Sequence, residues 1–197
     1  MSASETQICN LALMKFGNIS IASVDDDTKE ARACKVFFPL LRDELVYSHP
    51  WNFAMKRADI SASLTTTPAF GFDYAYTVPA DCLRVWEFYG YDGDWVVENG
   101  ILLTDADAEI YIRYIYQVTQ AGKFNASFVQ CLATRLAAEL ATKLSDDKNM
   151  RAALLSDLYK VEIPRAYALN AMEGTRPLHK DEQPLDKGNF AWQTEGH

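Results

Sequence analysis

The sequence predicts an α+β chain, in which a four-helix bundle carries an inserted antiparallel β domain and an extended C-terminal arm. Three changes in residue pattern support this prediction. Apolar residues recur with helical spacing in residues 1–50 and 121–174, whereas residues 51–120 are rich in aromatic and β-branched side chains. Residues 175–197 show no periodicity at all. We therefore expect the bundle in the first two segments, the β domain in 51–120 and the arm in 175–197.

The composition is that of a folded globular protein. The chain has 197 residues, of which 49% are hydrophobic and 23% charged, so a disordered or collagen-like chain is excluded. No stretch approaches the roughly 18–20 apolar residues that span a bilayer. Residues 1–5 lack the basic and apolar regions of a signal peptide. We expect synthesis in the cytosol and no membrane partner.

The charge is acidic and is concentrated in the predicted β domain. The net charge is −8, and residues 51–120 hold 4 basic and 10 acidic groups, a balance of −6. Proteins that bind duplex DNA usually present a basic face, because the phosphate backbone dominates affinity. We therefore expect any contact with DNA to be loose and independent of sequence.

The first helix is predicted over residues 4–17. Ser4 and Gln7 have the spacing of a capping box, and Gly17 is a typical C-terminal stop. Its apolar residues follow helical spacing.

A second helix is predicted to start at Asp27 as N-cap, with Glu30 three residues later. Pro39 lies inside this helix and should kink it, and Pro50 should end it.

Several strands are predicted between the helices. Asn99-Gly100 separates two apolar runs, which is a strong hairpin signal. The longest strand covers residues 109–116, where isoleucines occupy one face and tyrosines the other. Such a strand is either covered on both faces or presents tyrosines to a partner, so Tyr111 and Tyr114 are candidate partner contacts.

Two further helices are predicted in the C-terminal part. Leucines and alanines recur every four residues over 125–144, which indicates a core helix. Asp146 or Asp147 is expected to cap the last helix, which ends near Gly174, and Pro164 should kink or break it.

Trp51 and Phe53 lie where helix gives way to strand. We predict that they pack the β domain onto the bundle and fix the angle between the two.

Motifs of known catalytic or cofactor chemistry are missing from the sequence. It contains no GxGxxG, P-loop, GxSxG or HExxH pattern, and its three histidines do not show ligand spacing. Asp25-Asp26-Asp27 lacks the alternation of a calcium loop, so we expect a solvated loop. The four cysteines lie at least 25 positions apart and are expected to be reduced. We predict no enzyme, cofactor or metal site.

Two stretches resemble the head–tail adaptor family of short-tailed bacteriophages, also called tail tubular protein A, gatekeeper or head–tail connector. They are His49-Pro50-Trp51-Asn52-Phe53-Ala54 and the run from Tyr74 to Val85, which reads YAYTVPADCLRV. The opening helix that leads to Gly17, the segment from Phe124 to Leu144 and the length near two hundred residues fit the same pattern. The resemblance covers about residues 4–172.

The resemblance implies a structural protein at the head–tail interface of the virion, made in the host cytoplasm. Members of the family form a ring, typically of twelve copies, between the portal protein and the tail nozzle. The ring continues the DNA channel during ejection, and no catalysis is implied. The alternatives are another head-completion or stopper ring protein, or a carboxylate-dependent hydrolase.

The arm at residues 175–197 gives no motif to match. Ordering it costs roughly 1–2 kcal/mol per residue of backbone entropy, so we expect another surface to hold it. Phe190 and Trp192 are the expected anchors, because a few buried aromatics carry most of an interface's energy. The basic residues that we expect to pair with a partner's acids are Arg176, Lys180 and Lys187. That partner is the portal or a neighbouring subunit, and the alternative is that the arm folds back on its own subunit.

Overall fold

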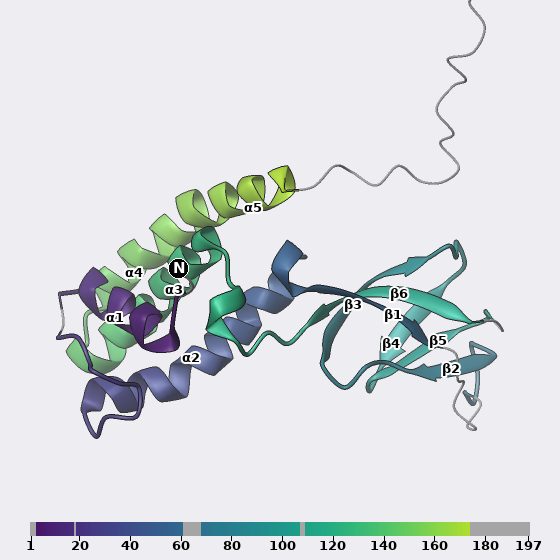
Figure 1. Cartoon of the computed structure of the whole chain (residues 1–197), viewed down its shortest axis with the longest axis horizontal. Coiled ribbons are helices and arrows are strands. Elements are labelled where there is room, and N and C mark those ends of the chain that lie inside the picture. Colours follow the sequence, from purple (N-terminus) through teal and green to yellow (C-terminus); the bar gives the residue numbers. More distant parts are fainter. Residues whose placement is uncertain (1–2, 18, 61–67, 107–108, 174–197) are drawn as a thin grey trace, which may run out of the picture.

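The computed structural model describes residues 3–17, 19–60, 68–106 and 109–173. It is a mixed α+β structure in which helices gather at one end and two small antiparallel sheets at the other (Figure 1). The strands come between the second and third helices in the chain. The helices are α1 (Glu5–Lys15), α2 (Lys29–Ser48), α3 (Ala126–Ser145), α4 (Lys148–Asp157) and α5 (Ile163–Met172).

The capping box predicted for the first helix is confirmed. The Gln7 backbone N–H donates to Ser4 Oγ at 3.2 Å, and the Ser4 N–H donates to Gln7 Oε1 at 2.8 Å. These two bonds satisfy donors that the first turn of a helix leaves free.

The predicted cap of the second helix is wrong by one residue. Thr28 is the N-cap, and its Oγ1 accepts the Ala31 N–H at 3.1 Å. Asp27 instead pairs with Arg32 at 3.0 Å. Pro39 lies inside α2 without ending it. The helix stops at Ser48, and the next residue, His49, is extended, as expected before a proline.

Helix α3 is the centre of the helical part. It packs against α1, α2, α4 and α5. The predicted leucine stripe is confirmed as core, since Leu132, Leu136 and Leu140 are fully buried. Alanines beside the leucines are buried too, so neighbouring helices can approach closely on more than one side.

The last helix, where a kink or break is predicted at Pro164, stays helical from Lys148 to Met172 but changes its hydrogen-bond pattern just before Pro164. Asp147 caps α4 by accepting the Met150 N–H at 2.8 Å. A π-helical turn, η3 (Leu158–Glu162), then separates α4 from α5. A proline lacks an N–H and its ring collides with the carbonyl four residues earlier, so the wider turn accommodates Pro164.

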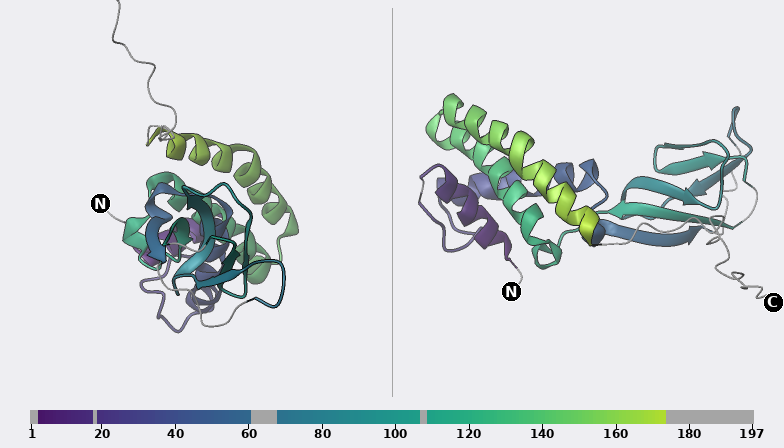
Figure 2. Two further views of the ribbon diagram at one scale, coloured as in Figure 1. Left: turned by 90° about the vertical axis from the view of Figure 1, so that its right-hand side faces the viewer. Right: turned by 90° about the horizontal axis from the view of Figure 1, so that it is seen from above.

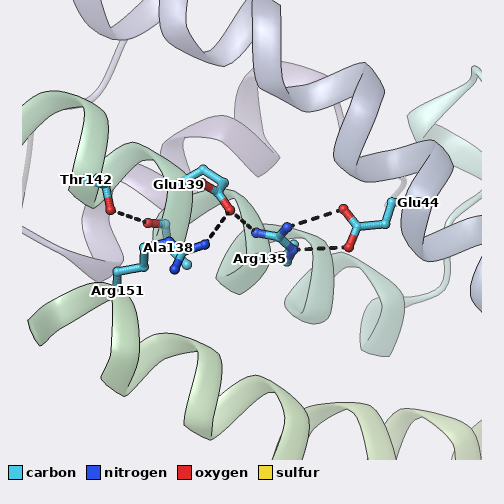
Figure 3. Close-up of polar contacts among 6 residues, drawn as sticks. All are labelled: Glu44, Arg135, Ala138, Glu139, Thr142 and Arg151. Atoms are coloured by element: carbon cyan, nitrogen blue, oxygen red, sulfur yellow. Dashed lines mark hydrogen bonds and ion pairs between the residues drawn. The ribbon is translucent and has the colours of Figure 1, made fainter. Parts of the chain in front are cut away.

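A charged network on Arg135 joins three helices (Figure 3). From α3, Arg135 contacts Glu139 one turn along, and its Nη2 lies 3.3 Å from Glu44 Oε2 on α2. Glu139 also pairs with Arg151 of α4 at 3.3 Å. Arg135 and Glu139 are largely buried, so this network is screened less by water than an exposed pair.

The strands form two sheets with the orders β1-β6-β3 and β2-β5-β4. Asn99 and Gly100 have φ values of 50° and 74°, so the predicted hairpin turn between β4 and β5 is confirmed. Strand β1 has no strand signal of its own in the sequence, because its residues do not alternate between apolar and polar. The strands are β1 (Met55–Ile60), β2 (Tyr74–Thr77), β3 (Cys82–Tyr89), β4 (Trp95–Glu98), β5 (Ile101–Thr104) and β6 (Ile110–Tyr116).

The two sheets share one core. Val85, Phe88 and Ile112 are buried on the inner face of β1-β6-β3, and Tyr76 and Leu102 are buried on the second sheet. All five belong to the same buried cluster, which also includes the helical core. The outer face of β1-β6-β3 therefore remains for other contacts.

We expect Arg135→Met to lower the free energy of unfolding by about 1–3 kcal/mol at neutral pH, because Glu139 and Glu44 lose their shared partner. Burial acts to raise the pKa of Glu139, but its bonds to Arg135 and Arg151 hold the pKa below its usual range. The stabilisation is therefore full above the unfolded carboxyl pKa, about 4.3, and is lost as the pH falls through the folded value.

Denaturant unfolding at several pH values measures this effect. The difference between wild type and Arg135→Met should shrink as the solution is acidified. Arg151→Met is the matched control, since that side chain is more exposed and should cost less than about 1 kcal/mol. A difference that stays constant into strong acid would contradict the assigned role of Glu139.

Candidate assembly surfaces and the junction between helices and strands

The chain leaves the helical part through a short junction after α2. Here η1 (Asn52–Ala54) leads directly into β1, and the C-terminal end of α5 lies beside it (Figure 2). Trp51 opens the junction and is only 1% exposed. Its indole N–H donates to the Leu45 carbonyl at 2.9 Å, which satisfies a carbonyl in the last turn of α2.

An aromatic cluster surrounds Trp51. Its ring centroid lies 5.1 Å from that of Phe128 on α3 and 5.5 Å from that of Tyr167 on α5. Phe53 packs on the same Phe128 ring at 5.0 Å and on Phe124 at 5.6 Å. The two predicted packing residues therefore fasten the junction to the helical part. That they also fix the angle of the strands stays a prediction.

Asn170 of α5 binds the junction with both its side chain and its backbone. Asn170 Oδ1 accepts the Asn52 N–H at 2.9 Å, and the Asn170 carbonyl accepts Asn52 Nδ2 at 2.7 Å. Asn170 Nδ2 donates to the Pro50 carbonyl at 3.2 Å. Asn170 is 6% exposed, so water could not easily replace these hydrogen-bond partners. We call Trp51, Asn52 and Asn170 the junction clamp.

His49 completes the clamp on its outer side. Its ring stacks on Tyr167 with centroids 3.8 Å apart, and its Nε2 lies 3.3 Å from Asn170 Nδ2. Burial lowers the pKa of His49, so the neutral imidazole dominates at neutral pH. A neutral ring nitrogen can accept the amide proton of Asn170, whereas a protonated one cannot.

Two contacts on α2 brace the strands from the other side. Gln117, just after β6, donates from Nε2 to Asp43 Oδ2 at 2.8 Å. The Arg84 guanidinium of β3 lies 5.6 Å from the centroid of the Tyr47 ring. The base of the sheet is thus held by α2 as well as through the junction.

The outer face of the β1-β6-β3 sheet carries exposed aromatic side chains. Tyr89 and Tyr111 are opposite each other on β3 and β6, and they are 46% and 48% exposed. Trp86 is 40% exposed and lies 5.2 Å from the Arg84 guanidinium. Arg57 lines a shallow hollow of about 420 Å³ with both tyrosines. We call this surface the aromatic face, defined by Arg57, Arg84, Trp86, Tyr89 and Tyr111.

The aromatic face has the chemistry of an interface. Tyrosine, tryptophan and arginine are enriched where proteins meet, because they combine large contact area with polar groups. Rigid strands hold these side chains, so little conformational entropy would be lost on docking. Tyr111 is held further by its hydroxyl, which donates to Glu109 Oε2 at 2.8 Å.

Tyr114 does not belong to this surface, which corrects the prediction that it contacts a partner. It is 4% exposed, and its hydroxyl donates to Asp81 Oδ1 at 3.1 Å. Burial and this bond raise the pKa of Tyr114 to about 12. Tyr114 faces the inner side because it lies three positions from Tyr111, and successive strand residues alternate between faces.

The remaining predicted contacts lie outside the described residues. These are the arm residues Arg176, Lys180, Lys187, Phe190 and Trp192.

The structure also locates the residues considered for metal or redox chemistry. The four cysteines are free thiols, and all but Cys82 are buried. Asp25 pairs with Lys35, and Asp26 accepts two backbone N–H groups of its own loop. Within the described ranges no group of three or more histidine, cysteine or acidic residues could hold a metal ion. No helix among those residues has the length and apolarity to cross a membrane.

No protein-family model and no curated protein sequence matches the chain.

We expect Trp51→Ala to lower the free energy of unfolding by about 3–5 kcal/mol, because it empties the centre of the aromatic cluster. Trp86→Ala is the matched control, since that tryptophan is 40% exposed and contacts Arg84, so it should cost only about 1 kcal/mol. Denaturant titration followed by circular dichroism measures both. Equal losses for the two variants would contradict the packing role of Trp51.

We expect Asn170→Ala to cost about 1–3 kcal/mol, because the Asn52 N–H and the Pro50 carbonyl lose their partner. Asn149→Ala, at an exposed position of α4, is the control and should be nearly neutral. Hydrogen exchange of the Asn52 amide should become faster in the first variant alone. An unchanged Asn52 exchange rate would show that the clamp does not depend on Asn170.

Proposed function

We propose that this chain is a structural virion protein of the head–tail adaptor type. In this proposal, copies of the chain form a ring that joins the portal protein to the tail nozzle and continues the DNA channel. Twelve copies are expected, from the resemblance of the His49–Ala54 and Tyr74–Val85 stretches to that family. The chain is not an enzyme in this proposal, and the head–tail interface of the virion is its location.

The aromatic face is the observation that carries the proposal. A subunit of a ring needs exposed, preorganised contact surface, and Trp86, Tyr89 and Tyr111 offer it on rigid strands. The net charge of −8 supports a channel role, because an acidic lumen would let DNA pass without gripping it.

We interpret the helical part as a four-helix bundle with an inserted β domain. In this interpretation α1, α2 and α3 are three members, and α4, η3 and α5 together form the fourth. The strands from Met55 to Tyr116 are then the insertion, and the junction clamp is where it is attached. Residues 175–197 supply the arm in this interpretation.

Ring closure requires a heterologous contact, in which one surface meets a different surface of the neighbour. We assign the aromatic face to one side of this contact and the polar flanks of α2 and α4 to the other. Such contacts can stay unformed until a portal ring templates them, so the isolated chain is expected to be monomeric at micromolar concentration. The arm would then fasten the ring to the portal or to a neighbouring subunit through Phe190 and Trp192.

Negative-stain microscopy and solution mass measurement with purified portal rings of the same phage test the proposal. We expect extra ring density on the portal when the chain is added. The double variant Tyr89→Ser/Tyr111→Ser should lower occupancy about tenfold or more, since each buried aromatic contributes about 1 kcal/mol or more to an interface. Its melting temperature should fall by no more than a few degrees, because both side chains are about half exposed.

Tyr159→Ser is the matched control, because Tyr159 is an equally exposed tyrosine outside the aromatic face. Deletion of residues 175–197 should weaken attachment to the portal without lowering the melting temperature. A chain that never joins the portal would refute the adaptor role. A stable ring formed without the portal would reject only the templating step.

A further inference from the structure

A hollow of about 510 Å³ lies between the N-terminal half of α2 and the C-terminal end of α3. This is the end of the helical part that points away from the strands (Figure 1). Its apolar lining residues are Ala33, Val36, Phe37 and Leu144, and we call this set the floor. Its basic lining residues are Lys29, Arg32 and Lys143, and we call this set the rim.

The floor exposes aliphatic surface that the fold does not use. Val36 is 61% exposed, and Leu40, one turn further along α2, is 64% exposed. On the other side of the same helix, Phe38, Leu41 and Leu45 are buried in the core. Burial of Val36 and Leu40 by a partner would therefore add apolar contact without disturbing the helical part.

Two of the three rim cations lack a carboxylate partner among the described residues. The side chains of Lys29 and Lys143 form no hydrogen bond or ion pair within the part of the chain that the structure describes. In the same part of the chain Arg32 pairs with Asp27 alone, whose side chain is almost fully exposed, so a partner's carboxylate could replace it. Of the acids in the neighbouring segments, Asp25 pairs with Lys35 and Asp147 caps α4, whereas Glu30 in the first turn of α2 and Asp146 at the end of α3 lie beside the rim. Unpaired cations are notable in a chain with a net charge of −8.

We propose that this hollow binds an acidic segment of a partner protein that carries one large apolar side chain. The apolar side chain would cover Val36 and Leu144, and flanking carboxylates would pair with Lys29 and Lys143. Nucleic acid fits less well, because a phosphate backbone would satisfy the cations and leave the apolar floor uncovered. This inference goes beyond the proposed function, since it concerns the end remote from the aromatic face and does not require a ring.

Nuclear magnetic resonance titration of the full chain with short peptides tests the assignment. The probe is acetyl-Glu-Asp-Phe-Asp-Glu-amide, compared with the same peptide carrying serine in place of phenylalanine and with a version carrying lysine in place of each acid. We expect saturable shifts of the backbone amides of the hollow with the first peptide. The serine peptide should bind about fivefold more weakly or worse, and the lysine peptide should not bind.

Two pairs of variants separate the rim from the floor. Lys143→Glu should weaken binding about fivefold, whereas Lys160→Glu, an exposed lysine outside the hollow, should not. Val36→Ser should weaken binding of the phenylalanine peptide, whereas Val161→Ser, a similarly exposed valine, should leave it unchanged.

Several results would overturn the assignment. Equal binding of the serine or lysine peptide, shifts mapped to another surface, or an equal loss with Lys160→Glu would each do so. Absence of saturable shifts at millimolar peptide would also refute it. Self-association of the chain that Lys143→Glu abolishes would assign the hollow to a second copy instead.

Discussion

The hydrogen bonds between Asn170 and Asn52 connect two parts of the chain that are 118 positions apart. They hold the end of α5 against the point where the backbone leaves α2 for the strands. Without the Asn52 partner, the side chain of Asn170, which is 6% exposed, would lose a hydrogen bond, and leaving a buried polar group unsatisfied costs about 1–3 kcal/mol. The stacking of Tyr167 on His49 and the burial of Trp51 depend on the same placement of α5.

This arrangement makes the junction a packed structure rather than a linker. Asn170 and the aromatic cluster hold it from α5 and α3, and Asp43 and Tyr47 hold the base of the sheet from α2. With contacts on both sides, rotation of the strands about the junction would break several of them together. The aromatic face and the hollow at the far end are then displayed at fixed positions on one elongated body.

Local sequence signals predicted the elements well. Three predictions depended only on local backbone hydrogen bonding or backbone dihedral angles, so a few residues were enough to make them. They are the capping box of Ser4 and Gln7, the turn at Asn99-Gly100 and the effect of Pro164. The regular spacing of leucines in α3 likewise predicted that this helix is buried in the core. The N-cap at Thr28 was missed because Asp27 and Thr28 both suit the position, and the tertiary structure decides between them. Strand β1 was missed because its sequence, MKRADI, carries little periodicity, and its pairing with β6 comes from distant residues.

Fewer residues of the candidate site than of the fold could be predicted from the sequence. Tyr111 and Tyr114 were treated alike, although an odd separation along a strand places them on opposite faces. One feature of the sequence could have pointed to Asn170. Its amide lies four residues after the buried Ala166, on the same apolar side of α5. Its partners Asn52 and Pro50 could not be identified, because the contact joins segments on either side of the whole β part.

The junction clamp is expected to hold helices and strands as one rigid body. Residual dipolar couplings of backbone amides in the weakly aligned protein test it most directly, because each rigid body has its own alignment tensor. We predict that couplings from α1–α5 and from β1–β6 fit a single tensor with the orientation seen in the structure. Two tensors of different magnitude would contradict the claim, since they would show that the strands move independently of the helices.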